Sequence, residues 1–235
     1  MYNAGGPVLR VCKQQIKGSP RLERVISLID LQRKTLGPYN TNSYLLVESK
    51  TQDAILVDVP AESEIILSWI EPFRIQRILL THGHADHVGA LEQVRQALNV
   101  PVAIHPTDGQ EFEILTETSL ENGTSIPLGE ARLELVHIPG HTQGSVALKV
   151  FIGTTFLFAI VGDTIFPGGP GHTTSPQALQ QSLEALERTV FTWPDSIELH
   201  PGHGDSTTVG AERGSFESFR AKPLPSELYG DVRWR

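Results

Sequence analysis

The alternation of apolar and polar residues predicts two successive groups of strands, each accompanied by helices. In the first group, the apolar runs that we expect to form strands are residues 23–31, 42–49, 53–59, 76–80 and 101–104. The segment 61–71 places its apolar residues on one helical face, so it is predicted to form a helix that ends before Pro72. A further helix is expected from Val88 to Leu98, because apolar residues recur there at helical spacing.

The second half of the chain repeats this order. The strands expected there are residues 131–138, 145–152, 155–162 and 196–200. The segment 175–191 is predicted to be a helix with Ser175 as its N-cap and a buried stripe of leucines. From Gly210 onward the periodicity fades, so we expect a core of about residues 23–213 and a C-terminal tail, residues 214–235, that lies on the surface or is partly ordered.

This pattern favours one domain, residues 1–235, because no change of composition marks a linker. Two halves that each run from strands to helices favour an α/β (α+β) protein with sheets inside and helices outside.

Composition and charge narrow the classes of function. The formal net charge is −8, with 27 acidic and 19 basic residues, which counts against a nucleic-acid-binding protein. The most apolar run, residues 150–162, is too short for a transmembrane helix, which needs about 20 residues. The single cysteine, Cys12, permits no intramolecular disulfide and fits a reducing compartment. We therefore expect a cytoplasmic protein that binds neither membrane nor nucleic acid and acts on a small molecule, and the sequence indicates no oligomeric state.

One short segment is crowded with metal-binding side chains. The sequence "THGHADHVGA", residues 81–90, contains His82, His84, Asp86 and His87 between a predicted strand and a predicted helix. A loop at that place lies at the rim of a sheet, so these side chains cannot all be buried in the core. Imidazole and carboxylate groups at this density predict a site for a divalent metal such as zinc, iron or manganese.

Three later loops carry further candidate ligands. His141 follows a Pro-Gly pair, Asp163 follows a glycine, and His203 lies between two glycines. Each loop follows the end of a predicted strand, and glycine or proline permits a tight turn there. We expect these strand ends to converge on one rim and to complete an active site with the first cluster.

Other polar residues near these loops are candidates for supporting roles. His105 follows a strand end on the same rim, where it could support a ligand or contact substrate. His172 lies in a Gly/Pro-rich loop that could border the substrate cleft, although a surface loop is the favoured interpretation. Thr142 is expected to hold its loop through its hydroxyl group. His137 and His200 are interpreted as packing or supporting residues.

Four motifs in order resemble those of the metallo-β-lactamase-fold hydrolases. They are H-x-H-x-D-H at 82–87, P-G-H-T at 139–142, G-D-T-x-F at 162–166 and P-G-H-G at 201–204. The glyoxalase II-like (hydroxyacylglutathione hydrolase-like) branch is the most similar. The resemblance implies a four-layer αββα sandwich, the metallo-β-lactamase fold. It also implies two metal ions, the first held by His82, His84 and His141, the second by Asp86, His87 and His203, with Asp163 bridging both.

That resemblance implies a dinuclear hydrolase of small esters, thioesters or lactones that acts through a metal-bridging hydroxide. Zinc is the first expectation for both ions, with iron or manganese as alternatives. Asp86 would also be the catalytic residue that could orient the hydroxide. Few residues follow His203, so the C-terminal helical region with which full-length glyoxalase II enzymes help to bind glutathione is not expected here.

Other functions of the same fold stay open as alternatives. These are an iron-dependent persulfide dioxygenase and a phosphodiesterase or nuclease, whereas a true β-lactamase is disfavoured by Asp163. The ligand-bearing segments 82–90, 137–145, 160–174 and 198–208 contain no Lys or Arg, which favours a small neutral or singly charged acyl substrate. Basic residues brought to the site by folding, for example from the C-terminal segment, residues 219–235, would reverse this argument.

Overall fold

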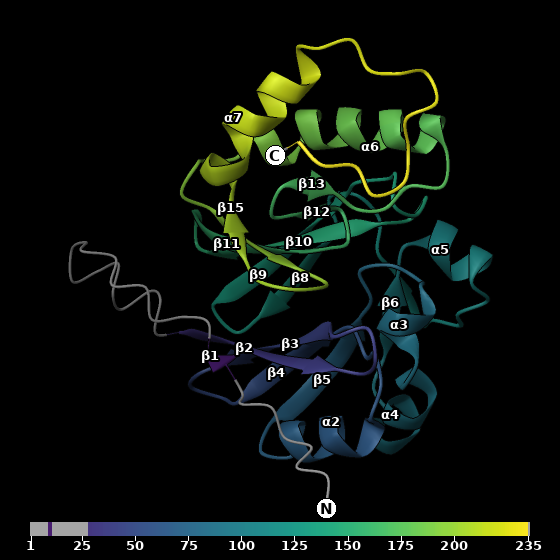
Figure 1. Ribbon diagram of the computed structural model, residues 1–235. Helices are drawn as coiled ribbons and strands as arrows, with labels where there is room; N and C mark the ends of the chain where they lie inside the picture. The colour runs from purple at the N-terminus through teal and green to yellow at the C-terminus, as the bar shows by residue number, and fades with distance from the viewer. Residues whose placement is uncertain (1–8, 11–27, 235) are drawn as a thin grey trace, which may run out of the picture.

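Two β-sheets lie face to face, with helices on both outer surfaces (Figure 1). This computed structural model describes residues 9–10 and 28–234, so Cys12 and the N-terminal part of the predicted strand 23–31 lie outside the described residues. A seven-stranded sheet comes from the first half of the chain and a six-stranded sheet from the second. No helix among the described residues is both long enough and apolar enough to cross a membrane.

The first sheet has its strands in sequence order. They are β1 (Leu9–Arg10), β2 (Ile29–Leu36), β3 (Thr41–Glu48), β4 (Asp53–Val57), β5 (Arg74–Leu79), β6 (Val102–Ile104) and β7 (Thr118–Ser119). The pairs from β1 to β4 are antiparallel, and those from β4 to β7 are parallel. The accompanying helices are α2 (Ser63–Ile70), α3 (Ala85–Val88), α4 (Leu91–Leu98) and α5 (Pro106–Glu111).

The second sheet has the order β15-β14-β11-β10-β9-β8. Its strands are β8 (Ser125–Leu128), β9 (Ala131–His137), β10 (Val146–Ile152), β11 (Thr155–Gly162), β14 (Glu198–Pro201) and β15 (Thr207–Thr208). A small hairpin of β12 (Ile165–Phe166) and β13 (Gly169–Pro170) stands apart from it. The helices of this half are α6 (Pro176–Arg188), the 3-10 turn η1 (Val190–Thr192) and α7 (Val209–Arg220). Ser175 accepts the Ala178 amide at 3.1 Å, which confirms the predicted N-cap.

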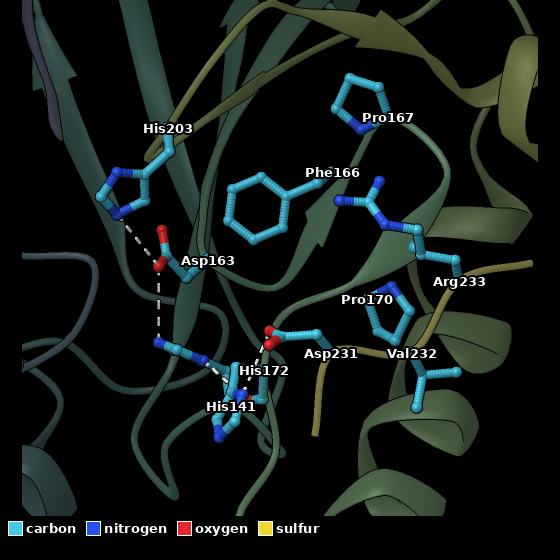
Figure 2. Close-up of a pocket in the computed structure, with 11 residues that line it drawn as sticks. His141, Asp163, Phe166, Pro167, Pro170, His172, His203, Asp231, Val232 and Arg233 are labelled. Carbon is cyan, nitrogen blue, oxygen red and sulfur yellow. Dashed lines mark hydrogen bonds and ion pairs between the residues drawn. The ribbon is translucent and has the colours of Figure 1, made fainter. Parts of the chain in front are cut away.

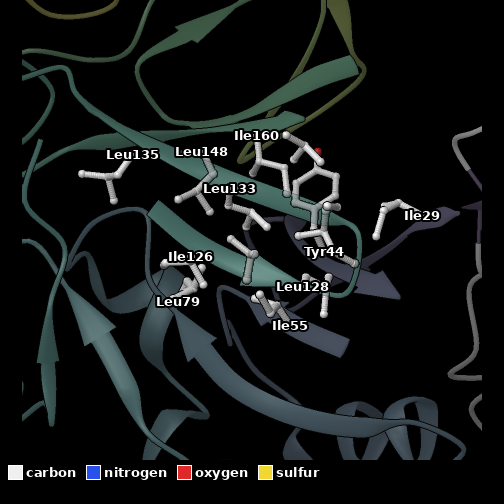
Figure 3. Close-up of a cluster of buried hydrophobic side chains, with 14 of the residues drawn as sticks. Ile29, Tyr44, Ile55, Leu79, Ile126, Leu128, Leu133, Leu135, Leu148 and Ile160 are labelled. Carbon is white, nitrogen blue, oxygen red and sulfur yellow. The ribbon is translucent and has the colours of Figure 1, made fainter. Parts of the chain in front are cut away.

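Three apolar clusters hold these layers together. Between the sheets, Tyr44 and Leu79 from the first sheet pack with Leu133, Leu148 and Ile160 from the second (Figure 3). Burial of such side chains stabilises the fold by about 1.5–3 kcal/mol each. Separate clusters join the first sheet to α2 and α4, and the second sheet to α6 and α7. The predicted four-layer αββα sandwich is thereby confirmed.

Two elements differ from the sequence-based expectation in their bounds. The first described long strand starts at Ile29 and continues to Leu36, past the predicted end at residue 31. The helix expected from Val88 to Leu98 is two helices, α3 and α4, separated at Gly89 and Ala90. The helix is divided there because the Val59 backbone accepts the Ala90 amide at 3.0 Å and donates to the His87 carbonyl at 2.8 Å, in place of bonds within one continuous helix.

The expectation of a tail at residues 214–235 was wrong for residues 214–220, which belong to a helix, whereas residues 221–234 lie outside any helix and most of their side chains are exposed or half-buried. Helix α7 runs through the start of this segment, capped by Thr208, which accepts the Ala211 amide at 3.1 Å. Phe216 and Trp234 are buried in the outer cluster of the second sheet. Two glycines in α7 weaken its helical pattern in the sequence, and contact with the rest of the protein stabilises the helix instead.

Candidate metal centre

Seven ligand-type side chains from four segments meet at one rim between the sheets. The loop after β5 and helix α3 supply the first four, and the other three follow β9, β11 and β14. They form three overlapping groups in which the potential ligand atoms lie within 4.8 Å of one another: His82, His84 and His141; His82, His87 and Asp163; Asp86, His87 and His203. The structure therefore brings together every predicted ligand.

The nitrogen and oxygen atoms at the centre are closely spaced. The Nε2 atoms of His82 and His141 are 3.3 Å apart, and those of His87 and His203 are 3.4 Å apart. Asp163 lies between these pairs, with Oδ1 3.3 Å from His87 Nε2 and Oδ2 3.5 Å from His141 Nε2. Its Oδ2 is also 3.4 Å from His203 Nε2. One carboxylate thus contacts both ends of the cluster.

This spacing fits metal ions. Ligands held tetrahedrally at about 2.0–2.1 Å from one ion lie about 3.3–3.4 Å from each other, as the imidazole nitrogens do here. Among the described residues, the buried Asp163 Oδ1 accepts no hydrogen bond and has only the 3.3 Å contact with the His87 ring, which is costly unless positive charge offsets it. A Cβ at Gly202 would lie 2.1 Å from that oxygen and 2.5 Å from the His87 ring, so glycine is required for the ligands to approach.

Hydrogen bonds to the outer ring nitrogens orient the histidines. The Nδ1 atom of His141 is 2.9 Å from the His172 carbonyl, and that of His203 is 3.0 Å from the Tyr39 carbonyl. His82 Nδ1 lies 3.1 Å from the Thr81 hydroxyl. These contacts leave Nε2 of each ring directed at the centre, which is how metal-binding histidines are held.

Burial sets the charge state of three of these rings. It lowers the pKa of His82, His84 and His141 below the usual value for histidine. For His82, repulsion from His87 lowers the pKa further. Rings that are neutral at neutral pH offer a lone pair to a metal without first losing a proton.

Carboxylates have the opposite effect on the other two rings. Burial would lower the pKa of His87 and His203, but Asp58 and Asp163 raise that of His87 to about 10, and Asp163 and Asp86 raise that of His203 to about 10. Burial would likewise raise the pKa of Asp163, yet the two imidazoles hold it well below its usual range. A metal ion bound in place of the protons on His87 and His203 would lie beside two ionised carboxylates, those of Asp163 and Asp86.

Asp58 lies behind the ligand cluster, on the side of the outer nitrogen of His87, and was not predicted from the sequence. It follows β4 with a left-handed backbone (φ 59°) and is buried. Its Oδ2 lies 2.8 Å from His87 Nδ1 and accepts the Thr81 hydroxyl at 2.8 Å, while Oδ1 accepts the Thr81 amide at 2.8 Å. It thus fixes a ligand and the loop that carries the first ligands. The one signal for Asp58 in the sequence was its position, as an aspartate near the end of a predicted strand.

Asp108, in α5, is a second buried carboxylate that the sequence analysis missed. It accepts the Gly83 amide at 2.9 Å and the Gly144 amide at 2.6 Å. It also accepts the Thr142 hydroxyl at 2.7 Å, which places the predicted supporting role of Thr142 on this carboxylate. Asp108 therefore ties the loop of His82 to the loop of His141.

The two histidines predicted as possible supporting residues differ in position. His105 caps α5 by accepting the Thr107 amide at 3.3 Å, and its ring stacks on His137 with centroids 4.1 Å apart. His172 borders the cleft, and its side chain is exposed, so both the cleft and the surface interpretations describe its position. Its carbonyl contacts His141, and its ring lies 3.1 Å from an Asp231 oxygen.

A cleft opens onto the ligand cluster. It has a volume of about 250 Å³, near the lower end for small-molecule sites. His141, Asp163 and His203 form its floor, and the walls come from residues 166–172 and 231–233 (Figure 2). The centre is thus open to a small molecule from this side.

Comparisons with known proteins agree with this geometry. The sequence model of the Metallo-beta-lactamase superfamily matches residues 36–192 of the chain. The hydroxyacylglutathione hydrolase GloC of Haemophilus influenzae is 31% identical over 191 residues, which cover 72% of this chain and 89% of that protein.

Solved structures extend the likeness to three dimensions. TTHA1623 in a di-iron-bound form is 30% identical, with a TM-score of 0.61 over 77% of this chain and 96% of that chain. The BLEG-1 B3 metallo-beta-lactamase is 25% identical, with a TM-score of 0.67 over 78% of this chain and 96% of that chain. Both likenesses cover more than three quarters of the chain.

Proposed function

Because the chain belongs to the metallo-β-lactamase superfamily, we propose that it is a hydrolase that uses two metal ions to cleave small esters, thioesters or lactones. The observation that carries this proposal is the pair of ligand groups joined through Asp163. The similarity to a protein named hydroxyacylglutathione hydrolase supports thioesters as the first substrates to test.

The ligand assignment follows the contacts at the centre. One ion would be held by His82, His84 and His141, the other by Asp86, His87 and His203, and Asp163 would contact both. Seven ligands for two ions leave coordination positions for water and substrate. Zinc suits these nitrogen and oxygen donors, and iron is the principal alternative, because a similar protein has been solved in a di-iron-bound form.

When bound, such a pair of cations lowers the pKa of water and polarises a carbonyl group. The protein's own groups prepare that chemistry. The carboxylates of Asp163 and Asp86 offset the positive charge, and Asp86 Oδ2 lies 3.1 Å from His203 Nε2. The Thr41 hydroxyl donates to the same oxygen at 3.3 Å, which holds the carboxylate where it can orient an attacking water.

Metal quantification together with a substrate panel tests this function. The purified protein should contain two transition-metal ions per chain. Its kcat/KM should be higher for a thioester and a lactone than for a bis-aryl phosphodiester or a β-lactam. A phosphodiester with the highest kcat/KM would refute the acyl-hydrolase assignment. One tightly bound iron together with oxygen uptake would favour the dioxygenase alternative instead.

A pair of variants tests the ligand set. Asp163→Ala should lower kcat by at least about 100-fold and reduce the metal content, because this carboxylate contacts both ligand groups. The matched control is His105→Ala, which removes a histidine that stacks on His137 and contacts no ligand group among the described residues. It should keep kcat within about threefold. Equal losses in the two variants would contradict the assignment.

A further inference from the structure

The C-terminal strap, residues 230–234, forms one wall of the cleft. Gly230 and Thr173 exchange backbone hydrogen bonds of 3.0 and 3.2 Å, and the Trp234 amide donates to the Gly168 carbonyl at 2.9 Å. The strap therefore runs beside the loop that follows Asp163, and Figure 2 shows it facing that loop.

Buried side chains fix the strap on either side of Arg233. Val232 and Trp234 are 7% and 8% exposed. The Trp234 indole donates to Glu212 Oε2 at 3.0 Å, and the same oxygen accepts the Gly168 amide at 2.9 Å. One buried carboxylate thereby joins the strap to the opposite wall, so the backbone of Arg233 has a defined position.

Arg233 itself is exposed and lines the cleft. Figure 2 shows its side chain extending from the strap toward Phe166 and Pro167. It is the single Lys or Arg among the described residues that line this cleft, and it forms no ion pair with another described residue. Asp231 also lines the cleft, but its carboxylate lies 3.1 Å from the His172 ring.

We propose that Arg233 binds a carboxylate group of the substrate, so that the substrates are small acyl esters or thioesters that carry one carboxylate. This inference rests on the proposed function and deepens it. A guanidinium group binds a carboxylate through two parallel hydrogen bonds. Away from the proposed metal ions, Arg233 is the one Lys or Arg side chain among the described residues of the cleft, and the carboxylate of Asp231 lies beside it, so a singly charged group is favoured there over a doubly charged phosphate.

Matched substrate pairs test the proposal. In the first pair the acyl half carries the carboxylate: a succinyl thioester of N-acetylcysteamine and the same compound with the free carboxylate methylated. In the second pair the leaving thiol carries it: S-acetyl-3-mercaptopropionate and its methyl ester. The pair in which the free carboxylate raises kcat/KM identifies the half of the substrate that Arg233 binds.

Arg233→Ala should lower kcat/KM for that carboxylated substrate by about 10- to 100-fold, mainly through KM, and leave its methyl ester within about threefold. Arg233→Lys should recover part of the loss, because it keeps the charge without the two-pronged geometry. The control is Lys222→Ala, which removes an exposed cation from the same C-terminal region and should change neither member of a pair.

The proposal fails if the wild-type protein prefers neither carboxylated substrate, or if Arg233→Ala affects both members of a pair equally. Calorimetric binding of butyrate, which carries one carboxylate, to the metal-loaded protein separates the inference from the proposed function. If no ester or thioester is hydrolysed, the proposed function falls, and this titration then decides the inference. Loss of butyrate binding in Arg233→Ala but not in Lys222→Ala supports it, and unchanged binding overturns it.

Discussion

Replacing His200 by leucine should change how the stability of the protein depends on pH. His200 lies on β14 and is 2% exposed, with its ring centroid 5.9 Å from Tyr44 and 5.3 Å from Phe158. Burial, together with repulsion from Arg33, lowers its pKa from 6.5 to about 3. The folded protein therefore keeps this imidazole neutral under conditions in which the unfolded chain protonates it.

The sign of the effect follows from proton binding. Between its unfolded and folded pKa values, the unfolded chain binds the additional proton, so the free energy of unfolding decreases as the pH falls through this range. The stabilisation is complete above the unfolded value. The loss from this one group is about 2 kcal/mol at about pH 5 and about 3 kcal/mol at about pH 4.

Urea denaturation of the wild type and of His200→Leu measures how His200 contributes to the pH dependence of the free energy of unfolding. A chelator is present so that metal release does not contribute. The substitution has its own packing cost, which does not vary with pH. The stability of the wild type relative to the variant should therefore fall by about 2 kcal/mol between about pH 8 and about pH 5. His200→Phe should give the same change. A constant difference across this range would refute the claim that His200 is held neutral.

Three further substitutions test the buried carboxylates. Asp58→Asn should weaken metal affinity by about 10- to 100-fold in a competition titration, because His87 loses its anionic partner, and unchanged affinity would contradict that role. Asp108→Ala should lower the free energy of unfolding by about 3 kcal/mol, because it leaves the Gly83 and Gly144 amides unpaired and leaves the Thr142 hydroxyl with Ser145 alone, and a loss below about 1 kcal/mol would show that the two loops do not depend on it. Glu212→Ala should speed amide hydrogen exchange in the strap by releasing Trp234, and unchanged exchange there would show that this contact does not hold the strap.

The sequence predicted the layers of the fold because its strands and helices have strong local patterns. Strands β3, β10 and β11 each contain a run of apolar strand-forming residues, and α6 has a continuous buried stripe beginning after Ser175. Helix α7 was not predicted because Gly210 and Gly214 interrupt its helical sequence pattern. Its burial depends on contacts with the second sheet. Local propensity cannot reveal a helix that is stabilised mainly by tertiary packing.

The same distinction applies to the candidate site. The ligand-type side chains could be predicted because four of them lie within six residues of the sequence and each of the other three follows a glycine. Asp58 and Asp108 lie outside that cluster of ligand-type residues, and their importance comes from donors 23 to 36 residues away in the chain. The position of Arg233 beside the cleft likewise depends on how the strap docks, which no short-range pattern specifies.

The way in which the cleft wall meets the ligand cluster has an evolutionary consequence. The loop that faces the strap supports His141 through the backbone carbonyl of His172, so this support does not depend on the side chain at that position. Mutations at Arg233 can therefore alter what enters the cleft without disturbing how His141 is oriented, whereas the Phe166 ring lies near His203, with centroids 6.2 Å apart. Selection can act on substrate preference along a lineage while the inherited ligand cluster stays intact, which is one route by which a single fold comes to host many activities.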